Sequence, residues 1–266
     1  MKSLRELMSL KGRVAIITGG AGKIGEAFAE ALAELGATLC ILDIVGDAAE
    51  QRSFCLHENF AVETSAFVVD VSQETSVQGV VAAAGERYSH IDILVNNAAY
   101  PPLPLPPDRC DLEGQSLQQW NANLEVILTG AFLMTRACAP WLRRTGRGVV
   151  INVGSIYGLI GPDLRLYEGT TMTNSAYYAA AKGGIIQLTR YWATTLSPQV
   201  RVNCIAPGGV WRQQPEKFHD RYRFRTPLGR MAVEEDFKGA IAYFATDLSA
   251  YVTGQVLAVD GGWMAW

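Results

Sequence analysis

A glycine-rich turn between two apolar segments constrains this chain more than any other part of its sequence. Residues 13–18 (RVAIIT) form a short β-branched apolar run that is typical of a buried parallel strand. Residues 19–25 (GGAGKIG) follow as the turn, and residues 26–35 have helical periodicity. A second apolar run, residues 38–43, ends in Asp43. A strand, a glycine-rich turn, a helix and an acid-terminated strand in this order predict a dinucleotide-binding βαβ unit.

The chemistry of this unit favours NAD as the cofactor. Glycines in the turn let the backbone approach a pyrophosphate, and the helix N-terminus supplies N–H donors and the positive end of a dipole. The Asp43 carboxylate is placed to accept a hydrogen bond from a ribose hydroxyl and would repel a 2′-phosphate. Lys23 could reach a pyrophosphate or a 2′-phosphate, so NADP stays possible. The expected cofactor contacts here are Gly19, Gly22, Lys23, Ile24, Gly25 and Asp43.

Strands and helices alternate through the rest of the chain, without a repeat or a low-complexity segment. We expect further strands within residues 66–71, 91–95, 149–153, 201–205 and 255–262, and helices within residues 75–88, 120–142, 177–196 and 234–248. Residues 101–107 are rich in proline and predict a loop. The pattern predicts one α/β domain over residues 1–266, a Rossmann-type doubly wound parallel sheet of about seven strands with helices on both faces.

Residues at the carboxyl ends of the later strands are further candidates for cofactor contacts, because ligands bind at this edge of open parallel sheets. Asp70, which Val71 follows, could accept from an adenine amino group or cap a helix. Asn96, Asn97 and Ala98 could line the adenosine side or form an Asx turn. We expect Asp70, Val71, Asn97 and Ala98 to contact the cofactor.

Tyr178 and Lys182 are the candidate acid/base pair. On a helix their spacing puts both side chains on one face, one turn apart. A tyrosine hydroxyl has an ordinary pKa of about 10, and a neighbouring ammonium group favours the phenolate and lowers that pKa. We therefore expect Tyr178 to act as an acid/base near neutral pH. The same spacing also fits an amphipathic helix with a packed tyrosine and a lysine that extends to solvent.

Composition excludes several classes of partner. The 266 residues carry a net charge of −3, which gives no electrostatic case for nucleic acid or an anionic membrane. The five scattered cysteines lack a C-x-x-C pair, which disfavours disulfides and a metal site and favours a reducing compartment. Residues 1–12 lack the apolar segment of a signal peptide, and no apolar run approaches the ~20 residues of a membrane span. We expect a cytoplasmic protein without a bound metal.

Together these motifs resemble the classical short-chain dehydrogenase/reductase (SDR) family, over residues 10–263. The ordered motifs that carry the resemblance are Thr18 to Gly25, Asp70, Asn96-Asn97-Ala98, Ser155, Tyr178 with Lys182, Pro207-Gly208 and Asp260-Gly261-Gly262. The resemblance implies an NAD(P)-dependent oxidoreductase (EC 1.1.1.-) that moves a hydride between the nicotinamide and a secondary alcohol or ketone. Family members are usually dimers or tetramers, so a homo-oligomer, such as a homotetramer, is expected.

The resemblance also implies roles for single residues. Tyr178 would be the general acid/base, and Lys182 would lower its pKa and hold the nicotinamide ribose. Ser155 would hydrogen-bond the substrate oxygen, unless it only caps a helix. The cofactor contacts implied at the nicotinamide end are Tyr178, Lys182, Pro207, Gly208 and Val210.

Three departures from the family pattern bear on function. Lys23 stands where the second glycine is usual, and the turn instead reads T-G-x-x-G-x-x-G, a spacing seen in extended relatives that act on nucleotide sugars. Ala99 replaces the last glycine of N-N-A-G. Ile127 takes the place of an asparagine that holds a water in the proton relay, and Asn123, one turn earlier, could partly substitute.

A fourth departure is an insertion at residues 162–174, between Ser155 and Tyr178, which we expect to shape substrate choice. It belongs to the expected substrate loops at residues 156–175 and 208–226. Arginines in the second loop suit a phosphate or carboxylate, or simply lie on the surface. An insert of this kind that continues into M-T-N, with a closing G-G-W, resembles family members associated with bacterial surface-sugar biosynthesis. We therefore expect a small-molecule substrate that is a sugar derivative, a sugar nucleotide or an anion.

Two other functions stay open. Ile127 is compatible with a cofactor-binding protein that has little or no turnover. The spacing of Gly19, Gly22 and Gly25 is compatible with a sugar-nucleotide epimerase or dehydratase that retains its NAD. The apolar residues 263–266 predict either a buried subunit interface or packing against the chain's own core.

Overall fold

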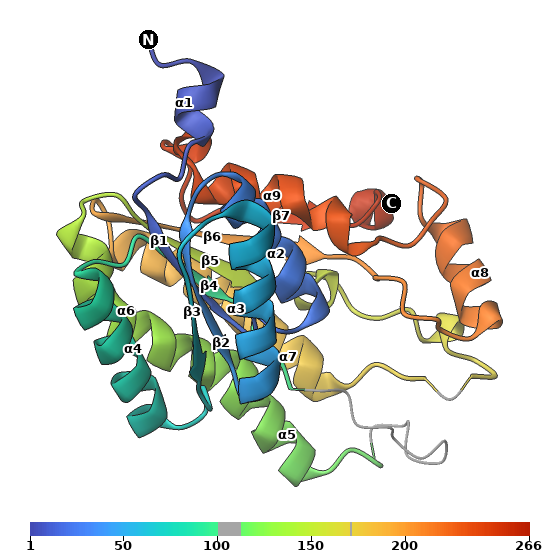
Figure 1. The fold of residues 1–266 in the computed structure, drawn as a ribbon. Helices are drawn as coiled ribbons and strands as arrows, with labels where there is room; N and C mark the ends of the chain where they lie inside the picture. Colours follow the sequence, from blue (N-terminus) through green and yellow to red (C-terminus); the bar gives the residue numbers. More distant parts are fainter. Residues whose placement is uncertain (101–112, 171) are drawn as a thin grey trace.

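The computed structural model describes residues 1–100, 113–170 and 172–266, and a parallel β-sheet forms its centre (Figure 1). This described part of the chain holds a seven-stranded sheet in the order β3-β2-β1-β4-β5-β6-β7. The strands are β1 (Val14–Thr18), β2 (Thr38–Asp43), β3 (Thr64–Val68), β4 (Ile93–Asn96), β5 (Gly148–Val153), β6 (Val200–Pro207) and β7 (Val256–Val259). The predicted doubly wound sheet is confirmed. The loop predicted at residues 101–107 lies outside the described residues.

The strand order reverses at β1, which pairs with β2 on one side and β4 on the other. Ile16, in the middle of β1, has Cys40 and Leu94 as its two partners. Connections leave this point toward opposite edges of the sheet, so a crevice opens beyond the carboxyl ends of β1 and β4. The sequence motifs at the ends of these strands therefore meet in space.

Helices cover both faces of the sheet (Figure 1). The α-helices of the described residues are α1 (Leu4–Met8), α2 (Lys23–Glu34), α3 (Gly46–Phe60), α4 (Glu74–Tyr88), α5 (Leu117–Leu124), α6 (Gly130–Arg144), α7 (Ala176–Thr195), α8 (Glu216–Arg225) and α9 (Lys238–Ala245), of which α1 and α8 lie away from the sheet (Figure 1). Alternate residues of β1 enter separate cores, as strand geometry requires. Ile17 belongs to the core with Phe28 of α2, on the face that also carries α3 and α9. Ile16 belongs to the core with Met134 of α6, on the face that also carries α4 and α7.

The third strand is shorter than predicted. It was expected at residues 66–71 and instead ends at Val68, because its partner strand β2 ends at Asp43, which pairs with Val68. Asp70 and Val71 consequently lie in the turn beyond the strand, where side chains need not alternate between the two faces of the sheet. Both residues therefore lie beyond the carboxyl end of the strand, at the edge of the sheet where ligands bind.

The helix predicted at residues 120–142 is divided. α5 ends at Leu124, a π-helical turn follows at Glu125–Thr129, and α6 begins at Gly130. A π turn adds a residue to the helical path, so the 3.6-residue periodicity does not carry from one side of it to the other. Ile127 lies inside this turn and is buried.

The two expected substrate loops lie side by side (Figure 1). The second is only partly a loop, because it contains α8. The Arg221 guanidinium of α8 donates to the carbonyls of Arg165 (3.1 Å), Leu166 (3.3 Å) and Glu168 (2.6 Å) in the insertion. These bonds satisfy backbone groups of a segment without regular secondary structure and fix it against α8.

The C-terminal residues pack partly against the chain's own core. Trp263 is 1% exposed and stacks on Tyr222 of α8, with ring centroids 4.2 Å apart. Trp266 is 74% exposed, although its indole N–H donates to the Arg225 carbonyl (3.1 Å). Of the two alternatives for this segment, packing against the core holds for Trp263.

Within the described ranges, no helix is long and apolar enough to cross a bilayer. No cluster of three or more histidine, cysteine, aspartate or glutamate side chains there is arranged to hold a metal ion. The cysteines that the structure describes are free thiols, at Cys40, Cys55, Cys138 and Cys204.

We predict opposite stability changes for two glycines of α4. A Cβ added at buried Gly85 would lie 2.3 Å from carbons of the Trp141 ring, so Gly85→Ala should lower the free energy of unfolding by about 1–3 kcal/mol. Gly79 is exposed and a Cβ there meets nothing within 4 Å, so Gly79→Ala should raise it by about 0.5–1 kcal/mol. Urea denaturation measures both, and equal stability of the two variants would contradict this packing.

Candidate active site

A cavity of about 970 Å³ lies at the carboxyl ends of the strands, where the strand order reverses. Its volume is in the range of small-molecule sites, about 300–1,000 Å³. Its lining includes the expected cofactor and catalytic residues Gly19, Gly22, Lys23, Ile24, Gly25, Asp43, Asp70, Val71, Asn97, Ala98, Ser155, Tyr178, Lys182, Pro207, Gly208 and Val210, but not Asn96.

Asn97 holds the glycine-rich turn against the end of β4. Its Nδ2 donates to the carbonyls of Thr18 (3.1 Å) and Gly19 (2.9 Å). Thr18 Oγ1 in turn accepts from the backbone N–H groups of Asn97 and Ala98, both at 3.1 Å. Gly19 has a φ of +61°, and a Cβ there would lie 2.9 Å from Ala98 Cα. A Cβ at Gly25 would lie 2.3 Å from the Gly19 carbonyl oxygen, so only glycine fits either position.

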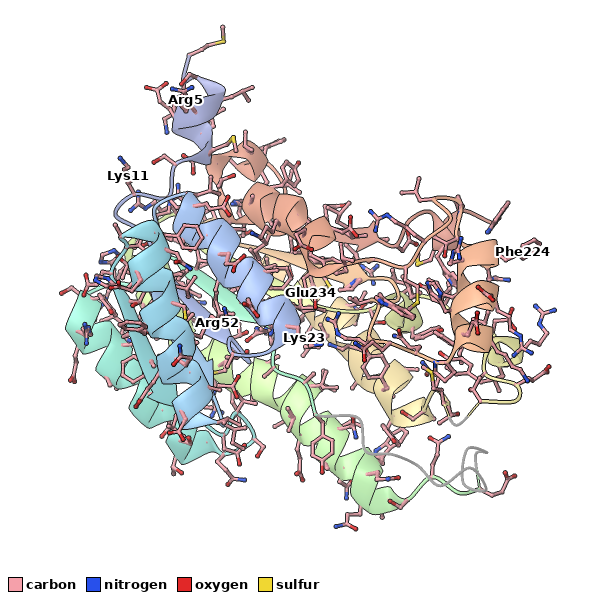
Figure 2. The ribbon with its side chains drawn as sticks, turned by 45° about the vertical axis from the view of Figure 1, so that its right-hand side comes forward. Arg5, Lys11, Lys23, Arg52, Phe224 and Glu234 are labelled. Carbon is pink, nitrogen blue, oxygen red and sulfur yellow. The ribbon has the colours of Figure 1, made fainter. Side chains whose placement is uncertain are left out.

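Asp43 and Lys23 line the same cavity, beside this turn. The Asp43 carboxylate accepts from the backbone N–H groups of Ala21 (3.1 Å) and Val45 (3.2 Å), which fixes its position. Lys23 is the first residue of α2, and its side chain is exposed (Figure 2). A helix N-terminus for phosphates and a fixed carboxylate for ribose hydroxyls fit a dinucleotide. Sequence reasoning missed Ile44, which also lines the cavity and is 65% exposed; an apolar residue directly after the acid was its signal.

Asp70 does not cap a helix. Its Oδ1 accepts from the Ser72 backbone N–H (3.0 Å) and hydroxyl (2.6 Å), which closes a tight turn after β3. The N-cap of α4 is Gln73 instead. The helix-cap alternative is therefore wrong, and Asp70 remains a residue of the cavity lining.

Ser155, Tyr178 and Lys182 also meet in this cavity. Ser155 Oγ accepts from the Tyr157 backbone N–H (3.2 Å), so the serine does cap a short 3₁₀ helix. The same side chain lies close enough to Tyr178 to lower its pKa. The Lys182 ammonium lies 5.7 Å from the centroid of the Tyr178 ring and donates to the Val153 carbonyl (2.7 Å). As the spacing predicts, α7 presents the tyrosine and the lysine on one face.

The pKa shifts of this pair differ from the expectation. Burial raises the pKa of Tyr178, and the Ser155 side chain opposes that rise. Burial also lowers the pKa of Lys182 to about 8. Lys182 does not lower the pKa of Tyr178 in this structure, where desolvation of the phenol dominates.

Ile127 is 3% exposed and packs in an apolar cluster with Ile185. The space that it lines together with Lys182 measures about 10 Å³, at the lower limit for a single water of about 10–15 Å³. Asn123, the suggested partial substitute, donates its Nδ2 to the Gln119 carbonyl (2.9 Å) of its own helix and does not line the large cavity. Asn123 therefore does not replace the asparagine missing at position 127, whereas Asn96 lines the same small space as Ile127 and Lys182.

The arginines expected to bind an anion are engaged within the protein. Arg212 lines the large cavity but forms an ion pair with Glu234 (2.7 Å). Arg225 forms one with Asp163 of the insertion (3.3 Å), and Arg221 donates to backbone carbonyls. The expectation of an anionic substrate gains no support from these side chains.

A smaller cavity of about 200 Å³ adjoins the large one, and the two share Ser155, Tyr178 and Gly208. The insertion and α8 each contribute two residues to its remaining wall, and the other five lie outside both segments. The sequence predicted that the insertion would shape substrate choice, but not which aromatic and amide side chains form this wall, which are Tyr157, Tyr167, Asn174, Phe218 and Tyr222. Their signal was weak, because only the i, i+4 spacing of the two aromatic residues of α8 marks one helix face.

Comparison with known proteins agrees with this geometry. The family described as enoyl-(acyl carrier protein) reductase matches residues 19–264. The 3-oxoacyl-[acyl-carrier-protein] reductase FabG of Thermotoga maritima is 34% identical over 263 residues, covering 96% of this chain and 99% of that protein.

Solved structures are similar over the whole chain as well. A gluconate 5-dehydrogenase from Burkholderia cenocepacia J2315, in complex with NADP and tartrate, has a TM-score of 0.87 at 29% identity, covering 99% of this chain and 100% of that one. An NAD⁺-bound xylitol dehydrogenase has a TM-score of 0.85 at 28% identity, covering 95% and 99%. Similarity that extends from the glycine-rich turn to the C-terminal residues shows that this chain belongs to the classical short-chain dehydrogenase/reductase family of NAD(P)-dependent oxidoreductases.

Proposed function

We propose that the protein interconverts a secondary alcohol and a ketone of a sugar-derived compound, with Tyr178 as the acid/base and NAD as the preferred cofactor. The observation that carries the proposal is that one cavity joins Asp43 and the glycine-rich turn to Ser155, Tyr178 and Lys182. Gluconate and xylitol, which the similar solved proteins are named for, are polyhydroxy compounds and favour a related substrate. A bound nicotinamide ring would accept or supply the hydride.

The side chains at the catalytic end would then have separate tasks. Ser155 Oγ would donate to the substrate oxygen and orient it beside the Tyr178 hydroxyl. Tyr178 would take the hydroxyl proton during oxidation and return it during reduction. Lys182, whose ammonium lies 5.7 Å from the centroid of the Tyr178 ring, would stabilise the phenolate that forms in the reaction, although it does not lower the pKa of Tyr178 in this structure.

The preference for NAD rests on the charge of Asp43. Its two oxygens each accept one backbone N–H bond, and a carboxylate oxygen has capacity for a further donor. A ribose hydroxyl would supply that donor, whereas a 2′-phosphate would meet like charge. The exposed ammonium of Lys23, which also lines the cavity, opposes this preference because it could pair with a 2′-phosphate.

Ile127 favours a second candidate function, a cofactor-binding protein with slow or no turnover. An isoleucine side chain cannot hydrogen-bond a relay water, and the space beside Lys182 is at the limit for one. Oxidation of an alcohol at several turnovers per second, the range of ordinary enzymes, would exclude this candidate. Stoichiometric NAD in the purified protein without net NADH release would instead favour the epimerase or dehydratase alternative.

Tyr178→Phe should abolish hydride transfer. We expect kcat/KM for xylitol, D-galactose or cyclohexanol, whichever is oxidised best, to fall by about 10²–10⁴ because the acid/base is lost. Tyr177→Phe is the matched control: this neighbouring tyrosine lines neither cavity, and its variant should stay within about twofold of the wild type. NADH fluorescence measures both the rates and the retained cofactor binding. Activity that survives in Tyr178→Phe would remove this residue from the mechanism.

The cofactor preference should depend on Asp43. We expect NADH to bind the wild type at least ~10-fold tighter than NADPH, and Asp43→Asn to bring the two dissociation constants within about threefold, since it removes the charge and keeps the shape. Asp47→Asn removes an exposed carboxylate of the same region and should leave the ratio unchanged. Isothermal titration calorimetry measures the constants. Tighter NADPH binding to the wild type would show that Lys23 outweighs Asp43.

Lys182→Met should stabilise the fold while it destroys activity. The folded-state pKa of Lys182 is about 8 against an ordinary value of 10.5, so burying the charged form costs a few kcal/mol below pH ~8. The unfolded state binds the extra proton between these two values, so wild-type stability rises as the pH increases from 8 to 10.5. We expect Lys182→Met to unfold at higher urea than the wild type at pH 7, with the gap closing by pH ~10.5.

The control for this variant is Lys217→Met, which alters an exposed lysine of α8 and should change stability by less than about 0.5 kcal/mol at either pH. If Lys182→Met were less stable than the wild type across the whole pH range, burial of the charged Lys182 would not destabilise the folded protein as described.

A further inference from the structure

The smaller cavity has an uncharged wall. Its described lining contains no lysine, arginine, aspartate or glutamate. Burial raises the pKa of Tyr157 and Tyr167, and raises that of Tyr222 to about 12, so these hydroxyls remain protonated at neutral pH. A carboxylate or phosphate placed here would lose its hydration without a counter-charge.

Most polar groups of this wall already have partners. Gln214 accepts from the Arg212 backbone N–H and donates to the Val210 carbonyl, both at 2.7 Å. The Tyr222 hydroxyl accepts from the Gly209 N–H. Few polar groups of the described lining are therefore free to hydrogen-bond a ligand.

The exception is a group of three side chains formed by Tyr157, Tyr167 and Asn174. The two tyrosine hydroxyls are 2.9 Å apart and share a hydrogen bond, and the Asn174 side chain beside them opposes the rise in the pKa of Tyr167. Asn174 Oδ1 is buried and has no hydrogen-bond partner. An unpaired buried acceptor is unfavourable, and a rotation about the soft terminal torsion of asparagine would turn this oxygen toward a ligand.

The segment that carries this group is held in place. Arg221 binds three carbonyls of the insertion, and Arg225 pairs with Asp163 at the start of it. Tyr167 also packs on Phe218 of α8, with ring centroids 5.1 Å apart. The wall is thus preformed, which reduces the entropic cost of recognising a ligand.

We propose that Asn174, beside Tyr167 in this wall, selects a compact, neutral substrate by accepting a hydrogen bond from a second hydroxyl on it, apart from the alcohol that reacts at Tyr178. This inference names the substrate class for the proposed oxidoreductase and rests on that function. A substrate hydroxyl can donate to the Asn174 oxygen, whereas a methyl group leaves that oxygen unpaired. A carboxylate has no hydrogen to donate and would place a second acceptor next to this oxygen. The volume, below that of sites for drug-sized ligands, excludes from this cavity the nucleotide part of a sugar nucleotide.

The test uses ring alcohols that differ at one substituent. The probes are the cyclohexane-1,3- and 1,4-diols, the matching 3- and 4-methylcyclohexanols and the matching hydroxycyclohexanecarboxylates, each oxidised with NAD. We expect kcat/KM of the better diol to exceed that of its methyl analogue by at least ~10-fold, and that of its carboxylate by more. A carboxylate preferred over the diols would overturn the proposal.

Substitutions test whether Asn174 is the residue that distinguishes the diol from its methyl analogue. Asn174→Ala should lower kcat/KM for the diol by about 10-fold, mainly through KM, and change that of the methyl analogue by less than about threefold. Tyr167→Phe keeps the ring but removes the hydroxyl beside Asn174, and should reduce the diol preference too. Asn121→Ala, an exposed asparagine outside both cavities, should change neither substrate. An equal loss for diol and methyl analogue in Asn174→Ala and in Tyr167→Phe would overturn the assignment.

A binding measurement separates this proposal from the proposed function. Calorimetric titration of the same probes into the NADH-loaded protein needs no turnover. If no alcohol is oxidised but the diol binds at least ~5-fold tighter than its methyl analogue, and Asn174→Ala removes the difference, the oxidoreductase function fails and the specificity assignment stands. If the diol and its analogue bind equally, or neither binds, the specificity assignment fails.

Discussion

The hydrogen bonds of Asn97 to the glycine-rich turn are the constraint on which the rest of the site depends. They join the end of β1 to the end of β4 at the point where the strand order reverses. Glycine at Gly19 and Gly25 lets the backbone come this close, and so the N-terminus of α2 borders the cavity. Residues far apart in the sequence line one cavity because these two strand ends are held together.

The opposite end of that cavity depends on burial. Lys182 and Tyr178 lie in surroundings that favour their neutral forms, and the structure gives the ammonium a single backbone partner at Val153. Burying these two groups lowers the stability of the fold, and small electrostatic changes in the site can then shift their protonation. Ile127 stands where the family pattern has an asparagine, so that polar group is absent at this position.

The alternation of apolar runs and helical segments was enough to predict the doubly wound sheet, and the motifs at strand ends predicted the lining of the cavity, because both depend on local sequence. Long-range pairing decided the rest. β3 ends at Val68 because β2 ends at Asp43, and no pattern in the β3 segment itself marks that limit. The group of Tyr157, Tyr167 and Asn174 forms only when the insertion packs on α8, and the arginines that suggested an anion turned out to bind the chain's own carbonyls and carboxylates.

The most direct test of the account is a crystal structure of the protein with NADH bound. The account predicts the pyrophosphate at the N-terminus of α2, the adenosine ribose hydroxyls within hydrogen-bond distance of Asp43, and the nicotinamide between Tyr178 and the Pro207-Gly208 backbone, with the smaller cavity open beside it. A dinucleotide that lies elsewhere, or one whose nicotinamide is remote from Tyr178, would contradict it.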